Sequence, residues 1–226
     1  MKNQSTFLSQ KSIAPSLLSA NFANLSSEIE AVTQGGADLL HLDIMDGHFV
    51  PNITMGPSIV KTVHKITPLP LDCHLMIENP EQYIEAFASA GAAMICVHGE
   101  APGVTIHTFE KIKNLGLKAG IAINPETNLQ SYIQFIEVSD YVLVMTVHPG
   151  FGGQKFIPEV LHKIKKAFAF RKDHKLSFAI EVDGGINEEN IATLSEAGAN
   201  IFVAGSAIFK SIDYTKTIKN MKRAIS

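Results

Sequence analysis

The sequence predicts a single-domain (β/α)8 barrel, an α/β fold, on the basis of three observations. Short apolar segments alternate with amphipathic ones from near the start of the chain to its end. The 226 residues supply roughly 28 residues for each of eight strand–helix units. No proline-rich or serine-rich linker divides the chain. We therefore expect residues 12–226 to form one barrel, preceded by a short N-terminal extension at residues 1–11.

Eight apolar segments have the length and the boundaries of buried parallel strands. Between them, apolar residues recur at helical spacing, as at Leu25, Ile29 and Val32. Glycines stand where a helix should end before the next strand, as at Gly91 and Gly116. A doubly wound open sheet is the rival fold class, but no glycine-rich fingerprint follows the first predicted strand. The strands are expected at residues 12–18, 39–46, 69–77, 92–98, 118–123, 141–147, 176–183 and 200–206.

The composition gives no sign of nucleic-acid binding, membrane insertion or secretion. The formal net charge is −3, and no basic run is longer than KIKK at residues 163–166. No segment approaches the roughly 18 apolar residues of a membrane span, and the starting segment MKNQSTFLSQKS lacks the apolar block of a signal peptide. We therefore expect a cytoplasmic protein in which Cys73 and Cys96, both in apolar segments, are reduced thiols of the core.

Polar residues gather at the ends of three predicted strands, where a barrel of this kind has its active site. His41 and Asp43 share a face of the second strand because they are two residues apart. His74 has the same position on the third strand, and Asp183 ends the seventh. Two histidines and two carboxylates form a ligand set suited to a divalent transition metal. Each residue alone could be an ordinary turn residue, but their convergence at one barrel mouth predicts a site.

Two further polar residues near His41 are separated from this set by their positions. Asp46 has the opposite parity to Asp43 and precedes Gly47, so we predict that it is a turn residue. His48 lies beyond that turn and is predicted to be a loop residue near the mouth.

Three glycine-bearing loops follow the last three predicted strands, at residues 148–154, 183–186 and 204–209. Backbone N–H groups in such loops can approach an anion closely, and the last two loops are the usual phosphate site of this fold. The only arginines, Arg171 and Arg223, lie in predicted helices. A phosphate held by backbone groups is therefore expected in place of an arginine clamp.

Seven segments, spanning residues 13–209, resemble the ribulose-phosphate 3-epimerase family in the expected order. HLDIMDGHFVPN and PGFGGQKF are specific motifs. The resemblance implies a barrel of the ribulose-phosphate-binding type, an isomerase of the pentose phosphate pathway that interconverts D-ribulose 5-phosphate and D-xylulose 5-phosphate. The seven segments are IAPSLLSANFANL, HLDIMDGHFVPNITMGP, DCHLMIENPEQYI, INPET, VLVMTVHPGFGGQKFI, EVDGGI and AGSAIF.

The resemblance also implies a cofactor, partners and site residues. The cofactor is one divalent ion per subunit, zinc, iron(II), manganese or cobalt, held by His41, Asp43, His74 and Asp183. A homo-oligomer, dimer or hexamer, is implied as well. Met45, Met76 and Met145 match residues that line the pocket, although they could also be plain barrel packing. The implied substrate contacts are Ser16, His74, Gly150, Phe151, Gly152, Gly153, Gly184, Gly185, Gly205 and Ser206.

The implied reaction needs two acid–base groups. Epimerisation at C3 replaces a proton on one face of the carbon by a proton on the other, through an enediolate that a metal stabilises as a Lewis acid. Inversion is achieved most simply by two groups on opposite sides of the substrate. Asp43 and Asp183, on the second and seventh strands, lie nearly across a ring of eight, so we predict that one abstracts the proton while the other donates.

Alternative functions would each require particular residues at the barrel mouth. A Schiff-base aldolase needs a lysine near the top of the barrel, but Lys118 begins its strand. A non-enzymatic binding barrel or an interaction module gives no reason for two opposed aspartates. A related 3-epimerase acting on a hexulose 6-phosphate, such as D-allulose 6-phosphate, stays open. The chain departs from the family's usual residues at Asn21, Asn128 and His148, and His148 lies beside the glycine loop.

Overall fold

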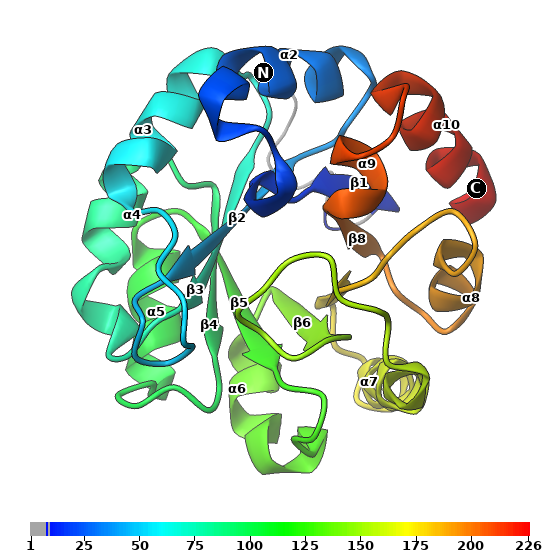
Figure 1. Ribbon diagram of the computed structural model, residues 1–226. Coiled ribbons are helices and arrows are strands. Elements are labelled where there is room, and N and C mark those ends of the chain that lie inside the picture. The colour runs from blue at the N-terminus through cyan, green and yellow to red at the C-terminus, as the bar shows by residue number, and fades with distance from the viewer. Residues whose placement is uncertain (1–7, 9) are drawn as a thin grey trace.

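Eight parallel strands form one sheet that curves into a barrel in the computed structural model, which describes residue 8 and residues 10–226 (Figure 1). The sheet order is β1-β8-β7-β6-β5-β4-β3-β2, and a parallel bridge between Ser16 and His41 joins its two ends. The predicted fold class is confirmed, and every predicted strand is present. The strands are β1 (Ser12–Pro15), β2 (Leu40–Met45), β3 (Leu71–Met76), β4 (Met94–His98), β5 (Lys118–Ile123), β6 (Tyr141–Met145), β7 (Ala179–Asp183) and β8 (Ile201–Ala204).

The first strand is shorter than predicted because a polar side chain ends it. The apolar pattern predicts a strand over residues 12–18, but β1 ends at Pro15. The Oγ of Ser16 accepts a hydrogen bond from the backbone N–H of Leu18, and the 3-10 helix η1 (Leu17–Ser19) follows. The strand prediction for residues 16–18 is therefore wrong, and the turn places the Ser16 hydroxyl at the barrel mouth.

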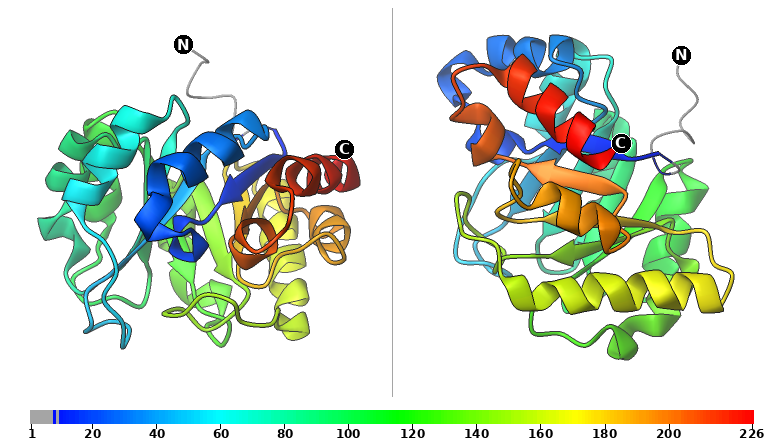
Figure 2. Two further views of the ribbon diagram at one scale, coloured as in Figure 1. Left: turned by 45° about the horizontal axis from the view of Figure 1, so that its top comes forward. Right: turned by 90° about the vertical axis from the view of Figure 1, so that its right-hand side faces the viewer.

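Helices surround the sheet in a ring (Figure 2), and α10 lies beside α2, so that the last helix meets the first of this ring. A short helix, α9 (Ser206–Phe209), is an addition to the predicted alternation of one helix after each strand. The 3-10 helices η2 (Phe22–Asn24), η3 (Pro80–Gln82), η4 (Leu129–Tyr132) and η5 (Pro158–Val160) precede α2, α4, α6 and α7. The helices of the ring are α2 (Leu25–Gln34), α3 (Pro57–Ile66), α4 (Ile84–Ala90), α5 (Ile106–Asn114), α6 (Ile133–Val138), α7 (Leu161–Asp173), α8 (Ile191–Glu196) and α10 (Tyr214–Ile225).

The alternation of side chains along the strands fills two separate apolar spaces. Outward-facing residues such as Leu42 pack between the strands and the helices. Inward-facing residues such as Tyr141 fill the barrel itself. The Tyr141 ring crosses Gly120 so closely that a Cβ there would lie 2.3 Å from the ring Cζ, so this position requires glycine. The tyrosine thereby fills the barrel floor beneath the polar groups of the mouth.

Three expectations from the composition concern the rest of the chain. Cys73 and Cys96 are both buried and free, as expected for core thiols. Within the described residues, no helix combines the length and the apolar character needed to cross a membrane. Most of the predicted extension at residues 1–11 lies outside the described residues, and β1 begins at Ser12.

Candidate active site

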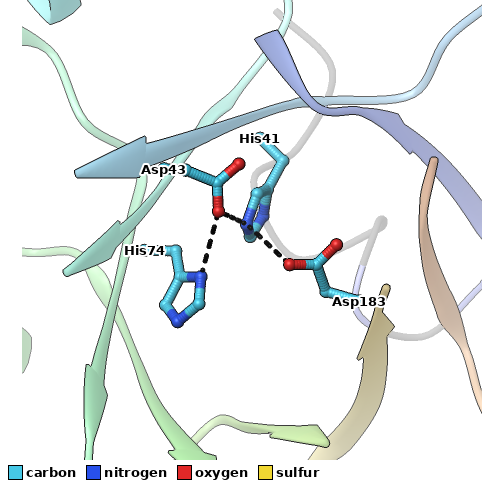
Figure 3. A group of neighbouring side chains, drawn as sticks. All are labelled: His41, Asp43, His74 and Asp183. Carbon is cyan, nitrogen blue, oxygen red and sulfur yellow. Dashed lines mark hydrogen bonds and ion pairs between the residues drawn. The ribbon is translucent and has the colours of Figure 1, made fainter. Parts of the chain in front are cut away.

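His41, Asp43, His74 and Asp183 converge at the barrel mouth, as the alternation of side chains predicts (Figure 3). Each offers one ligand atom, and these four atoms lie within 4.8 Å of one another. The Oδ1 of Asp43 is 3.4 Å from His41 Nε2 and 3.3 Å from His74 Nδ1. Asp183 approaches from β7, with its Oδ2 4.0 Å from His41 Nε2. Four nitrogen and oxygen donors at this spacing could hold a divalent metal ion.

The environment of His41 fits a metal ligand. Its Nδ1 is 2.7 Å from Asp72 Oδ2, and the hydroxyl of Tyr141 donates to the other oxygen of Asp72 at 2.6 Å. The Asp72 carboxylate accepts the Nδ1 proton, so Nε2 is the nitrogen that faces the cluster and could bind an ion once it has lost its own proton. Among the described residues this buried Nε2 has no hydrogen-bond partner. A histidine held by a carboxylate through one nitrogen is the usual arrangement of a metal ligand.

A buried acidic layer lies directly below the cluster, and its role was not predicted. The alternation of side chains places Asp72 on the same strand face as His74, and Glu181 on the same face as Asp183. Glu181 is fully buried, with Oε1 3.6 Å from His41 Nδ1. Burial and the charge of Asp72 raise the pKa of Glu181 well above its ordinary value, which favours its protonated form. The layer supports His41 from beneath, and we assign it no contact with substrate.

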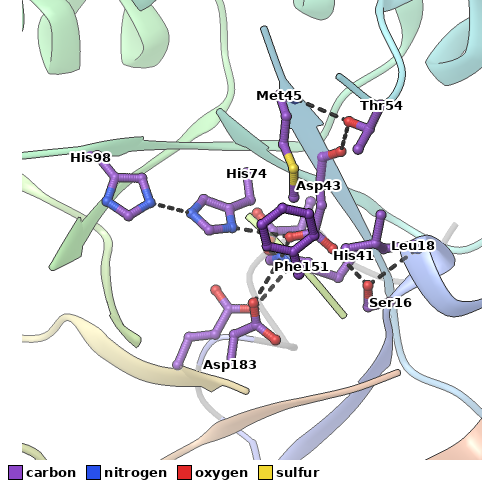
Figure 4. Close-up of polar contacts among 12 residues, drawn as sticks. Ser16, Leu18, His41, Asp43, Met45, Thr54, His74, His98, Phe151 and Asp183 are labelled. Atoms are coloured by element: carbon purple, nitrogen blue, oxygen red, sulfur yellow. Dashed lines mark hydrogen bonds and ion pairs between the residues drawn. The ribbon is translucent and has the colours of Figure 1, made fainter. Parts of the chain in front are cut away.

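His98 is a second residue that sequence reasoning missed. It ends β4, and its Nε2 is 2.8 Å from His74 Nε2 on the side away from Asp43 (Figure 4). Its Nδ1 is 3.4 Å from Glu100 Oε2. The signal was present, because Met94, Cys96 and His98 alternate in the same way as the residues around His74.

The two carboxylates of the cluster have opposite electrostatic environments. Burial alone would raise the pKa of Asp43, but the charge of His41 at 3.4 Å and the hydrogen bond with His74 lower it far below its ordinary value. Burial and the negative charge of Asp43 raise the pKa of Asp183 to about 7. Burial lowers the pKa of His74 to about 4, so its ring is neutral. At neutral pH, Asp43 is therefore ionised while Asp183 can carry a proton.

Asp46 and His48 have the structural roles that the sequence predicts. The Oδ1 of Asp46 accepts hydrogen bonds from the backbone N–H groups of His48 and Phe49. Its Oδ2 accepts one from the backbone of Glu78, which ties the loop after β2 to the loop after β3. The His48 side chain is 73% exposed.

A cavity opens above the cluster, and it brings together the predicted contact residues from four sides of the barrel. Ser16 and both aspartates reach its wall, whereas His41 and His74 are buried beneath it. Phe151 is half-exposed at its rim (Figure 4). The predicted residues on the wall are Ser16, Met45, Met76, Met145, Gly150, Phe151, Gly152, Gly153, Gly184, Gly185, Gly205 and Ser206.

Glycine-rich loops line one side of this cavity. Gly184 and Gly185 have φ angles of 125° and 67°, which side-chain-bearing residues rarely adopt. A Cβ on Gly185 would lie 2.4 Å from the backbone nitrogen of Phe156. No lysine or arginine is among the residues that line the described cavity. The cavity can therefore hold an anion through backbone N–H groups.

The three departures from the family's usual residues lie outside this cavity wall. His148 Nδ1 is 2.9 Å from Glu126 Oε1, and both side chains are 64% exposed. The side chains of Asn21 and Asn128 each accept a backbone N–H at the start of a 3-10 helix. These residues have local structural roles and do not shape the part of the cavity above the candidate metal site.

Fold and site together define a class: a (β/α)8 barrel with a candidate metal centre beneath a glycine-rich cavity at its mouth. The model of the Ribulose-phosphate 3 epimerase family matches residues 12–209, and the chain belongs to this family. The chain is 53% identical over 212 residues to "Ribulose-phosphate 3-epimerase" of Bacillus subtilis (strain 168), covering 93% of this chain and 97% of that relative. It is 46% identical to "Ribulose-5-phosphate-3-epimerase, chloroplastic" of Arabidopsis thaliana, covering 93% and 75%.

Solved structures with much lower identity support the fold class. The crystal structure of KGPDC from Streptococcus mutans has a TM-score of 0.70 at 13% identity, covering 96% of this chain and 97% of that one. The 3-hexulose-6-phosphate synthase of Salmonella typhimurium has a TM-score of 0.71 at 16% identity, covering 95% and 98%. Identities this low establish the shared barrel alone.

Proposed function

We propose that this protein is a metal-dependent epimerase that interconverts D-ribulose 5-phosphate and D-xylulose 5-phosphate in the pentose phosphate pathway. Family membership supports the reaction class, and relatives at 53% and 46% identity carry this activity in their names. The observation that carries the mechanism is the pairing of Asp43 with Asp183, two neighbouring carboxyls whose pKa values are displaced in opposite directions. Proton transfer at C3 needs one group of each kind at the same moment.

Asp43 and Asp183 divide the proton transfer between two faces of the substrate. In one direction the Asp43 carboxylate takes the C3 proton while protonated Asp183 donates to the opposite face, and in the other direction the roles reverse. His41, Asp43, His74 and Asp183 would hold a divalent ion, which would supply Lewis-acid stabilisation of negative charge on the substrate. Zinc, iron(II), manganese and cobalt all suit this ligand set.

The remaining cavity residues bind and shield the substrate. The loops that contain Gly184–Gly185 and Gly205–Ser206 hold the phosphate group with backbone N–H groups. Met45, Met76 and Met145 form an apolar wall that excludes water from the reacting carbon. Ser16 contacts both the substrate and Asp43. The active species in the cytoplasm is a homo-oligomer, dimer or hexamer, which sedimentation measurements would determine.

An assay of ribulose 5-phosphate conversion, before and after metal removal, tests this proposal. We expect activity to disappear on chelation and to return when a divalent ion is added. Full activity in the metal-free protein would refute the mechanism. Conversion of D-allulose 6-phosphate without conversion of ribulose 5-phosphate would reassign the substrate to a hexulose phosphate.

A further inference from the structure

Of the two histidines in the candidate metal site, His74 is the one whose outer ring nitrogen contacts no carboxylate. Its Nδ1 faces Asp43, and its Nε2 faces His98 Nε2 at 2.8 Å. The two rings are stacked, with centroids 4.9 Å apart. His98 in turn places Nδ1 3.4 Å from Glu100 Oε2. A row of three side chains therefore runs from the cluster through β4 into the loop that follows it.

The positions of the hydrogen atoms along this row follow from the carboxylate. Burial alone would raise the pKa of Glu100, but hydrogen bonds from His98, Thr127 and the Asn124 backbone lower it, so Glu100 is ionised and can only accept. His98 must then carry its hydrogen on Nδ1, which leaves Nε2 as an acceptor. With an ion bound, His74 donates from Nε2 and its Nδ1 lone pair is directed at the ion; without one, Nδ1 lies 3.3 Å from Asp43 Oδ1 and can donate to that carboxylate.

Glu100 itself is fixed in place from the opposite side. Its Oε1 accepts a hydrogen bond of 2.9 Å from the backbone N–H of Asn124, at the end of β5. The side chain of Lys163, buried on α7, donates to the carbonyl groups of Asn124 and Pro125. Because Oε1 is committed to a backbone donor, Oε2 is the oxygen available to His98.

We propose that Glu100 is a positioning residue which, acting through His98, fixes the tautomer of His74 that leaves Nδ1 free to bind the metal. This role rests on the metal site of the proposed function. It makes the two histidines of the cluster parallel cases: Asp72 orients His41 directly, and Glu100 orients His74 through one intervening ring. Glu100 touches neither metal nor substrate.

The variant Glu100→Gln replaces one oxygen of this row by nitrogen and reverses the direction of its hydrogen bonds. The glutamine oxygen must stay on the Asn124 N–H, so its NH2 group faces His98 Nδ1. His98 then carries its hydrogen on Nε2 and donates to His74, whose hydrogen moves to Nδ1. A protonated Nδ1 cannot bind a metal. We therefore expect the affinity for Co²⁺ to fall about 10- to 100-fold, a range typical of lost outer-shell support.

Two measurements test this role, neither of which uses enzyme activity. Nitrogen-15 NMR of the Zn²⁺-loaded protein reports which ring nitrogen of His98 carries hydrogen. Titration with Co²⁺, followed by its visible absorption, reports affinity and ligand geometry. Glu110→Gln is the matched control, because Glu110 Oε2 lies at the same 3.4 Å from His107 Nδ1 but on the surface.

In the Zn²⁺-loaded state, we expect wild type and Glu110→Gln to show His98 with hydrogen on Nδ1, and the two proteins should have equal Co²⁺ affinity. Glu100→Gln should show the opposite tautomer of His98 and the weaker binding. Hydrogen on Nε2 of His98, with none on Nδ1, in the Zn²⁺-loaded wild type would overturn the inference, even if the variant failed to fold. Unchanged tautomers and unchanged affinity in Glu100→Gln would overturn only the role of Glu100, whereas a wild type that binds no Co²⁺ would overturn the metal site.

Discussion

Asp43 and Asp183 are the same residue type at the same mouth, yet the barrel surrounds them differently. Asp43 accepts a 2.6 Å hydrogen bond from Ser16 and is flanked by His41 and His74. Asp183 makes no side-chain hydrogen bond within the described part of the chain, and its nearest cation partner is His41 at 4.0 Å. Since both residues are aspartates, their positions in the sheet decide which carboxyl holds a proton.

The sheet explains this difference. Asp43 lies inside β2, directly opposite His74 on β3, and the bridge that closes the barrel brings Ser16 alongside. Asp183 is the last residue of β7, followed by two glycines that offer no side chains. Its neighbour across the mouth is the negative charge of Asp43. The strand interior therefore supplies donors to one carboxyl, and the strand end leaves the other without them.

The largest expected effect comes from removing the proton-bearing partner. Asp183→Asn should lower the rate of epimerisation about 10²- to 10⁴-fold, because the donor to one face of C3 is lost. Asp43 remains able to abstract, so exchange of the C3 proton with solvent should persist for one epimer. Proton NMR in D2O measures both quantities. Loss of exchange for both epimers would contradict the division of labour between the two aspartates.

The sequence allows the positions of Asp43 and Asp183 to be predicted, but not the pKa values of the two carboxyls. The two-residue spacing of His41 and Asp43, together with a ring of eight strands, is enough to predict convergence with Asp183. The sign of each pKa displacement depends on burial and on partners from other strands. Ser16 illustrates the limit, because apolar periodicity placed it inside a strand, whereas its hydroxyl ends β1 and bonds Asp43.

The contacts of His98 and Glu100 beside the candidate metal site could not be predicted from the sequence either. His98 has the correct parity, but parity does not reveal that its ring reaches His74 rather than solvent. Glu100 lies in a loop, where no periodicity applies, and its contact with Asn124 joins segments 24 residues apart. Contacts of this kind depend on how far each strand extends along the barrel, which the pattern of residues leaves open.

A second prediction concerns the stability of the metal-free protein. The pKa of Asp183 rises from 3.8 to about 7 on folding, so the unfolded chain binds fewer protons between these values. The group therefore lowers stability progressively as pH rises from about 4 to 7, by up to about 4 kcal/mol. Asp183→Asn should remove this loss. Urea unfolding of both metal-free proteins at about pH 5 and pH 8 measures it, and equal pH slopes would contradict the raised pKa.

A third prediction concerns the pH dependence of metal affinity. Asp183, with its pKa of about 7, binds a cation more tightly once it has lost its proton. Despite burial, Asp43 and Asp72 raise the pKa of His41 well above its ordinary value, so this ring must lose a proton too. Affinity for Co²⁺ should therefore rise about tenfold or more per pH unit below pH 7. Competition with a chelator of known pH dependence measures this slope, which should be shallower in Asp183→Asn.

The smallest expected effect comes from weakening the donors around Asp43. Ser16→Ala removes the 2.6 Å hydrogen bond to Asp43 Oδ2 but leaves both histidines in place. We expect kcat/KM to fall about tenfold, since a hydrogen bond to a charged group contributes about 1.5–3 kcal/mol and the histidines retain most of the stabilisation. Ser139→Ala is the matched control, because this buried serine donates to the Phe135 carbonyl far from the mouth. A fall as large as that of Asp183→Asn would mean that the asymmetry between the two carboxyls depends chiefly on Ser16, and not on the histidines.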